Sequence, residues 1–288
     1  MIKIVTDSAS DLTKEYAEKY GIDILRFPIT VGERTLHDGD ISPEEYYDLI
    51  DSTPTMPVHS QITVMDFTEK YREYAEQGFT DVIYVSINSY GSSTYSNAVQ
   101  AITMFAEECP ELSDKIKVHV VDSLSYSATY GYPVIKAAQQ AAEGVPAEQI
   151  VKELEETFSS TEVYLACYTL RFAKKSGRIS AAAAFAGELL GFRPVILLSG
   201  KGTKTVAKVR GDANVVPKLA DIACDRIEKG TEYCVIGGRD LSHREELAKE
   251  LKKRFGYPPV PYDFRVHGVI SSNSGPDVVA VALFKTHK

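Results

Sequence analysis

The segment that decides the fold of the first half of this chain lies between residues 82 and 95. It reads Val82-Ile83-Tyr84-Val85-Ser86-Ile87-Asn88-Ser89-Tyr90-Gly91-Ser92-Ser93-Thr94-Tyr95. Residues 82–86 predict a buried strand, and a helical pattern begins at Ser93 and continues to about Cys109. Because a short loop joins this strand to the helix, the segment predicts the strand-loop-helix unit from which parallel sheets are built.

The same order recurs on both sides of this segment. Ile2–Thr6 and Lys117–Val121 predict two more strands, and each is followed directly by an Asp-Ser pair. Ile22–Val31 also looks extended, and its internal proline favours a sheet edge. Helices are predicted to begin after Ser42 and Thr63, which are each followed three residues later by an acid. The first half therefore predicts a parallel sheet covered by helices on both faces, with a ligand site at the carboxyl ends of its strands.

The second half has a different pattern. Strands are predicted at residues 163–169, 194–199, 203–209, 232–237 and 278–284, and helices at residues 181–190, 215–229 and 242–255. A glycine-containing turn between the second and third of these strands predicts a hairpin. We expect two domains in an α/β chain: an N-terminal parallel-sheet α/β/α domain at residues 1–160, and a C-terminal α+β domain with a mixed or antiparallel sheet at residues 161–288.

Composition excludes several classes of protein. The 288 residues carry 32 Lys and Arg against 40 Asp and Glu, a net charge of −8, so nucleic acid is not expected as the main partner. The start lacks the apolar core of a secretory signal, and the longest apolar region contains Glu188 and Arg193. We expect a cytoplasmic protein without stable membrane insertion. Four cysteines without a C-x-x-C pair predict reduced thiols, and the absence of a Cys/His cluster predicts no metal site.

The loop before residue 93 is the first candidate site. A helix N-terminus and nearby hydroxyls favour a bound anion such as a carboxylate or phosphate. The alternative is that Ser92 or Ser93 only caps the helix. The loop has neither the G-x-S-x-G pattern of a hydrolase nor the spacing of a P-loop. An anion bound without chemistry is the simplest interpretation.

Other candidate residues also have two interpretations. His59 and His267 lie in loops, where each is either structural or able to donate a hydrogen bond to a carboxylate. The basic stretches at 174–178 and 208–210 are either solvated surface or a docking face for an anionic partner. The run of small residues at 180–187 is either a buried helix or room for a long apolar ligand.

Taken together, these stretches resemble the DegV family of bacterial two-domain proteins. The matching segments follow the family's order and cover nearly the whole chain: residues 5–8, 59–61, 86–98, 121–123, 175–179, 193–197, 208–210, 267–268 and 275–276. The resemblance implies a carrier that binds a long-chain fatty acid such as hexadecanoate between its domains. Members of the family present the carboxylate to a separate fatty-acid kinase subunit, which makes an acyl phosphate.

The resemblance also implies roles for individual residues. Ser92 matches the family's binding serine, whereas His59 occupies the position of the family's binding threonine, so an imidazole replaces a hydroxyl there. Ser60 could substitute for it, or His59 could itself donate a hydrogen bond. The other residues expected to bind ligand are Asn88, Ser89 and His267.

Arg178 and Arg210 match the residues that the family offers to the kinase. We expect neither a catalytic centre nor a cofactor in this chain. The N-terminal domain would hold the head group, and the second domain would supply an apolar sleeve from residues 181–192 and 195–198. Two alternatives stay open: a serine-dependent enzyme acting on acyl or phosphoryl substrates through Ser92, and a lipid-sensing regulatory protein.

Overall fold

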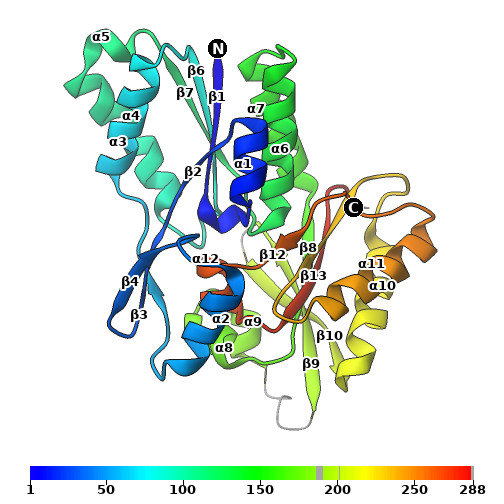
Figure 1. The fold of residues 1–288 in the computed structure, drawn as a ribbon. Coiled ribbons are helices and arrows are strands. Elements are labelled where there is room, and N and C mark those ends of the chain that lie inside the picture. The colour runs from blue at the N-terminus through cyan, green and yellow to red at the C-terminus, as the bar shows by residue number, and fades with distance from the viewer. Residues whose placement is uncertain (186–190, 201, 287–288) are drawn as a thin grey trace.

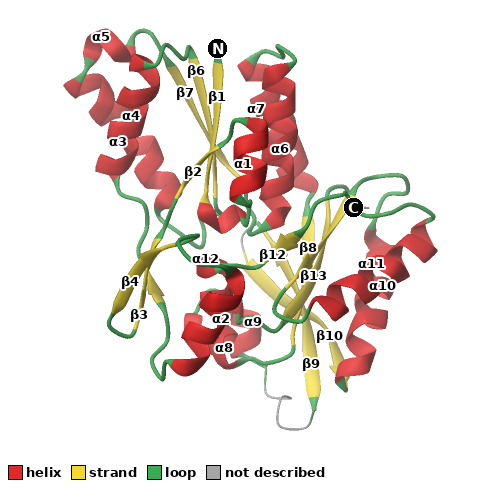
Figure 2. Ribbon diagram, viewed as in Figure 1, coloured by secondary structure: helices red, strands yellow, loops and turns green. Residues whose placement is uncertain are grey.

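The first half of the chain builds a parallel sheet between two layers of helices (Figures 1 and 2). The computed structural model describes residues 1–185, 191–200 and 202–286. In spatial order the strands of this first sheet are β2 (Asp23–Leu25), β1 (Ile2–Asp7), β6 (Asp81–Ser86) and β7 (Lys117–Asp122). One face is covered by α3 (Val64–Glu76), α4 (Thr94–Glu108) and α5 (Pro110–Ser113), and the other by α1 (Lys14–Tyr20), α6 (Ala128–Ala142) and α7 (Ala147–Ser160). The predicted α/β/α layering is confirmed.

Helix starts follow the capping patterns in the sequence. The backbone N–H of Glu45 donates to Ser42 Oγ at 3.2 Å, and the Glu45 carboxylate accepts from the Ser42 backbone N–H at 2.8 Å. This reciprocal capping box begins α2 (Pro43–Ser52), and Thr63 forms the same box with Asp66 at the start of α3. Both predicted starts are confirmed.

Residues 22–31 form two strands rather than one, which corrects the sequence prediction. β2 joins the first sheet, whereas β3 (Pro28–Val31) pairs with β4 (Arg34–His37) and β5 (Val58–His59) in a small antiparallel sheet. Pro28 has no backbone N–H to continue a hydrogen-bonded ladder, so the chain leaves the first sheet before it. The small sheet places His59 opposite Ile29.

The second half builds a six-stranded mixed sheet. Its order is β10 (Gly202–Arg210), β9 (Phe192–Ser199), β8 (Glu162–Cys167), β13 (Val278–Leu283), β11 (Tyr233–Gly237) and β12 (Phe264–Arg265). All neighbours are antiparallel except β11 and β12, and the predicted β9–β10 hairpin is confirmed. The helices α10 (Val215–Arg226) and α11 (Leu241–Phe255) cover one face (Figure 2). Short 3₁₀ turns lie at Ser8–Ser10, directly after β1, and at Asp212–Asn214, between β10 and α10.

Strand β13 shows that the middle of the second sheet is buried on both faces. Val279, Val281 and Leu283 belong to the apolar cluster beneath α10 and α11. The alternate residues Val278, Ala280 and Ala282 belong to a cluster that continues into the first half of the chain. Because successive side chains of a strand point to opposite faces, the inner face of this sheet is turned toward the first sheet.

Short helices complete this inner side, and most of them escape prediction. α12 (Gly268–Ser274) forms where the sequence predicts a loop, and α8 (Arg171–Ser176) forms where the sequence predicts no element. Of the helix predicted at 181–190, the described residues form only the single turn α9 (Ser180–Ala183), and residues 186–190 lie outside the described part. Helices this short take their stability from packing rather than from periodicity. The domain boundary at residue 160 stays a prediction.

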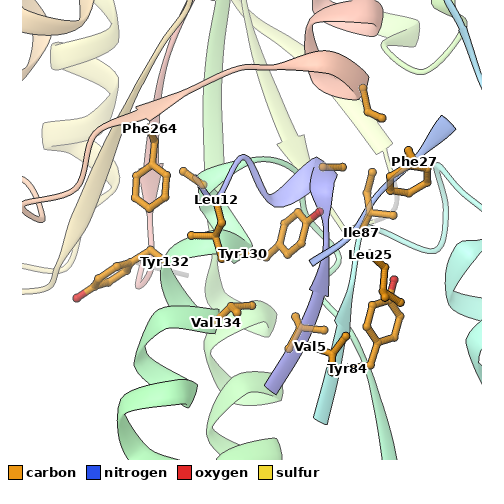
Figure 3. Close-up of a cluster of buried hydrophobic side chains, with 14 of the residues drawn as sticks. Val5, Leu12, Leu25, Phe27, Tyr84, Ile87, Tyr130, Tyr132, Val134 and Phe264 are labelled. Carbon is orange, nitrogen blue, oxygen red and sulfur yellow. The ribbon is translucent and has the colours of Figure 1, made fainter. Parts of the chain in front are cut away.

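Buried tyrosines join the first sheet to α6 at the end of β1. The hydroxyls of Tyr84 and Tyr130 donate to the Asp7 carboxylate at 2.8 and 2.6 Å, and the N–H of Ile87 donates to it at 2.8 Å. Figure 3 shows Tyr130 and Val5 in the same buried cluster. Burial, partly offset by these hydrogen bonds, raises the pKa of Asp7 to about 6. Asp7 thus fixes the loop that leaves β6.

Gly268 provides a test of how α12 packs. A Cβ atom at this position would lie 1.9 Å from Oδ1 of the buried Asp38 carboxylate. Because this overpacking must displace Asp38, we predict that Gly268→Ala lowers the free energy of unfolding by about 1–3 kcal/mol in urea denaturation. At Gly202 a Cβ would meet no atom within 4 Å, so Gly202→Ala is the matched control. Equal midpoints for the two variants would contradict this packing.

Candidate functional site

An apolar cavity lies between the carboxyl ends of the first sheet's strands and the inner face of the second sheet. Together with the space at its opening to solvent, it comprises about 790 Å³ not filled by atoms. The second sheet contributes Val163, Leu165, Leu198, Ile236 and Ala280; the first half contributes Phe27, Ile87, Tyr126 and Ser127; and α12 contributes Val269, Ile270, Asn273 and Ser274.

A polar cavity adjoins the apolar one, and we call it the polar mouth. It measures about 510 Å³ and is lined by His59, Gln61, Ser89, Tyr90, Gly91, Ser92, Ser93 and Arg178. Four of these residues also line the apolar cavity: His59, Gly91, Ser92 and Arg178. The two spaces therefore meet at these side chains, and together they have the shape needed by a ligand with one polar end and one apolar end.

Asn88 fixes the loop that forms one side of the mouth. Its Nδ2 donates to the Gly200 carbonyl at 2.8 Å, and its Oδ1 accepts from the Tyr90 backbone N–H at 2.8 Å. The sequence predicts Asn88 as a ligand contact, but it is buried and lines neither space. Its side chain instead ties the loop to the β9–β10 turn.

Gly91 and Ser92 form the centre of the loop. A Cβ at Gly91 would lie 2.5 Å from the Tyr126 hydroxyl oxygen, so a larger residue would displace that ring from the cavity wall. Ser92 Oγ lies 2.9 Å from Thr94 Oγ1 and accepts from the Thr94 backbone N–H at 3.3 Å. Ser92 therefore accepts from the first N–H of α4 and also lines both spaces. The first-turn N–H groups of α4 have no acceptor within the helix, which favours an anion at this end.

His59 lies on the opposite side of the mouth. Its Nε2 is 3.0 Å from Asn273 Nδ2, and its ring meets the edge of Phe27 at 6.3 Å between centroids. Burial lowers the pKa of His59, and the neighbouring Arg178 cation lowers it further. The imidazole is therefore neutral at pH 7, in contrast to an exposed histidine that would be partly charged.

Three other predicted site residues lie elsewhere. Ser60 is exposed and lines neither space, and Arg210 is exposed at the end of β10. The sequence predicts His267 as a ligand contact, but its Nδ1 bonds Asp38 Oδ1 at 2.7 Å and its Nε2 bonds the Ile41 carbonyl at 3.1 Å. Both ring nitrogens face acceptors. Burial alone would lower the pKa of His267, but the Asp38 carboxylate outweighs it and raises that pKa.

The apolar lining corrects the predicted sleeve. Of residues 195–198, only Leu198 lines the cavity, and Ala182 and Phe185 are buried outside it. Residues 186–190 lie outside the described part of the chain. The walls come instead from alternate residues of the second sheet and from α12. Strand alternation could have identified Leu165 and Ala280, whereas no pattern in the sequence identifies Asn273 or Tyr126.

One group of side chains in the described ranges could hold a metal ion. Ligand atoms of Asp81, His119 and Glu148 lie within 4.8 Å of one another, and Asp81 begins β6, at the end of that strand remote from the cavity. His119 Nε2 is 3.3 Å from Asp81 Oδ1, and Lys117 pairs with Glu148 at 2.8 Å. These pairs already balance much of the local charge. Because the group lies at the end of β6 remote from the cavity, it plays no part in the site described above.

Comparisons with known proteins show the family of this chain and similar folds. The family model described as "Uncharacterised protein, DegV family" matches residues 1–286. A DegV domain-containing protein of Staphylococcus aureus is 31% identical over 258 residues, which cover 88% of this chain and 86% of that protein. A stearic acid-binding protein from Eubacterium ventriosum superposes with a TM-score of 0.86 at 25% identity, covering 98% of this chain and 97% of that one. A structure titled as fatty acid binding of a DegV family protein from Thermus thermophilus gives 0.83 at 26% identity, covering 99% of both.

Within the described residues, every helix is too short or too polar to cross a bilayer.

The His267–Asp38 pair predicts a pH dependence of stability. A histidine whose folded-state pKa is raised stabilises the fold below its unfolded-state value of about 6.5, and that contribution is lost as pH rises through the folded-state value. We therefore predict that the free energy of unfolding falls between pH 6.5 and 8.5, and that His267→Gln removes this fall. Urea denaturation at several pH values measures both. Burial also raises the pKa values of Asp7 and Asp11, so the comparison with His267→Gln isolates the part of the fall that belongs to His267. A fall that persists unchanged in His267→Gln would contradict the assignment.

Proposed function

Because this chain belongs to the DegV family, we propose that it binds a long-chain fatty acid such as hexadecanoate, with the carboxylate in the polar mouth and the acyl chain in the apolar cavity. Similar proteins from Eubacterium ventriosum and Thermus thermophilus are described as fatty-acid binding, at 25% and 26% identity. The observation that carries the proposal is the meeting of the two spaces at His59, Gly91, Ser92 and Arg178.

The apolar cavity supplies most of the binding free energy in this proposal. Its walls are aliphatic and aromatic side chains such as Leu165, Ile236 and Phe27. Each methylene removed from water contributes about 0.8 kcal/mol, so the roughly fourteen methylenes of hexadecanoate give an upper bound near 11 kcal/mol. Lost translational and conformational freedom offsets part of this gain. Tight binding then needs only a few polar contacts.

The polar mouth suits a carboxylate for three reasons. Ser92 offers a hydroxyl, and Ser89 adds another at the surface. The fifteen-residue helix α4 directs its positive end at the same loop. Arg178 supplies a cation, and its Nη1 also donates to the Ser176 carbonyl at 3.0 Å, which holds the guanidinium near the rim.

The residues around the proposed head-group site are exposed to solvent. Ser89, Tyr90, Ser93 and Arg178 lie at the surface around the mouth, so a second protein could reach a carboxylate bound there. We propose a cytoplasmic carrier without a cofactor that presents this carboxylate to a separate kinase subunit for acyl-phosphate formation. Arg178 and Arg210 are both exposed and are the proposed contacts for that subunit.

A serine-dependent enzyme is the less favoured alternative. A nucleophilic serine needs a base within hydrogen-bond reach. Among the described residues, the hydrogen bonds of Ser92 Oγ go to Thr94, and the ring of His59 bonds Asn273. This arrangement supports ligand binding at Ser92 rather than its activation.

Lipid extraction tests the proposed ligand. We predict that the protein purified from a bacterial host yields a fatty acid of about sixteen to eighteen carbons in stoichiometric amount by mass spectrometry. Delipidated protein should take up the same acids from solution. A protein that carries no lipid and takes up none would overturn the proposal.

Substitution of Ser92 tests the position of the head group. We predict that Ser92→Ala weakens fatty-acid binding by about 1–3 kcal/mol, because a carboxylate removed from water loses a hydrogen-bond donor. Ser96→Ala is the control, because Ser96 is exposed on the same helix and lines neither the mouth nor the cavity. Displacement of a fluorescent fatty acid measures both. Equal affinities for the two variants would exclude Ser92 from the site.

The two arginines should separate binding from presentation. Arg210 lines neither space, so we predict that Arg210→Ala keeps its fatty-acid affinity and melting temperature but loses acyl-phosphate formation with an added kinase subunit. Each 1.4 kcal/mol of lost interaction lowers that coupling tenfold. Arg178→Ala should weaken both, because Arg178 lines both spaces. Full coupling in Arg210→Ala would remove that residue from the docking surface.

A further inference from the structure

Two hydrogen bonds determine where the proton of His59 lies. Asn273 Nδ2 lies 2.7 Å from the Val269 carbonyl oxygen, which can only accept, so this atom is the NH₂ nitrogen of the amide. The same nitrogen lies 3.0 Å from His59 Nε2. An NH₂ group can only donate, so Nε2 is the acceptor and is unprotonated. The single ring proton of the neutral imidazole is therefore on Nδ1.

The proton on Nδ1 is available to a ligand. Among the described residues, no hydrogen bond is formed by Nδ1, and it does not belong to the buried atoms that lack a partner. His59 lines both the apolar cavity and the polar mouth, so the ring stands where the two spaces meet. Asn273 lines only the apolar cavity.

From this arrangement we infer that Asn273 is a positioning residue, which keeps His59 in the neutral tautomer that donates Nδ1–H to the ligand's carboxylate. The inference rests on the proposed function and names a determinant of its head-group site. Asn273 acts through His59, and its own amide is anchored one helical turn back at Val269 on α12. The carboxylate then meets a neutral donor in place of an imidazolium.

On balance, the charged groups around His59 also favour the neutral form of its ring. The Arg178 cation approaches from the segment between α8 and α9, and together with burial it lowers the pKa of the ring. The Asp38 carboxylate acts in the opposite sense from the segment before α2, but it is occupied by His267 and the Val269 N–H. Phe27 contributes only a ring edge. A second proton on Nε2 would also point at the Asn273 NH₂ group, which cannot accept it.

This assignment predicts how fatty-acid affinity depends on pH. A neutral donor keeps its proton between pH 6.5 and 8.5, so the affinity of the natural protein should change less than twofold over that range. Asn273→Asp replaces the NH₂ group by an oxygen that accepts from Nε2–H and favours the imidazolium. Affinity in that variant should then fall at least tenfold as pH rises across the same range, because the imidazolium is the stronger donor and is lost.

Nuclear magnetic resonance of ¹⁵N-histidine-labelled protein reads the tautomer directly, with His59→Gln used to assign the signal among the six histidines. We expect the Nδ1–H tautomer in the ligand-free protein and its loss in Asn273→Ala, together with an affinity about fivefold weaker. Ser60→Ala, which changes an exposed residue beside His59 that lines neither space, should alter neither. Thermal melts establish that the variants are folded.

The outcomes separate the two proposals. An Nε2–H tautomer in the ligand-free natural protein, or an unchanged tautomer and affinity in Asn273→Ala, would overturn the role of Asn273 while fatty-acid binding stands. Failure of the natural protein to bind any fatty acid would overturn the proposed function. The tautomer of His59 would still be measured, because that measurement uses the ligand-free protein.

Discussion

The inner face of the second sheet is apolar and has to be covered, and the rest of the structure follows from how it is covered. Strand β13 is buried along its whole length, with alternate residues in the clusters on its two sides. On the outer side, α10 and α11 cover the sheet. On the inner side, α6, α12 and the carboxyl ends of the first sheet cover it incompletely. The cavity is the part of this cover that protein atoms leave open, which is why its walls are apolar.

A buried polar network holds the incomplete cover in place. Asp11 accepts from the Ser127 hydroxyl at 2.5 Å and from the His267 backbone N–H at 2.9 Å, and burial raises the pKa of Asp11 well above its usual range. Asp38 accepts from the His267 ring and from the N–H of Val269. Ser127 and Val269 are cavity walls. The network therefore fixes α12 against the first half of the chain, and a buried carboxyl group that lost its hydrogen-bond partners would be costly.

Prediction from sequence succeeded where one local rule decided the outcome. The capping boxes at Ser42 and Thr63 and the alternation of strands and helices gave the layers of the first half. The loop at residues 86–93 was predicted to bind the ligand, and its residues Ser89 and Ser92 line the polar mouth. Prediction failed where distant segments meet. From sequence alone His267 resembles a donor to the ligand, but in the fold its ring bonds Asp38, which is 229 residues away in the chain. The contact between His59 and Asn273 likewise spans 214 residues. Short helices such as α12 have no periodicity to detect, because their packing partners lie elsewhere in the chain.

A crystal structure of the protein with a bound long-chain fatty acid tests the central claim most directly. The account predicts continuous density for one acyl chain that runs between the two sheets past Leu165 and Ala280. Its carboxylate should lie within hydrogen-bond distance of both Ser92 Oγ and His59 Nδ1. An acyl chain bound outside this cavity, or a carboxylate placed at the end of the cavity away from Ser92, would contradict it.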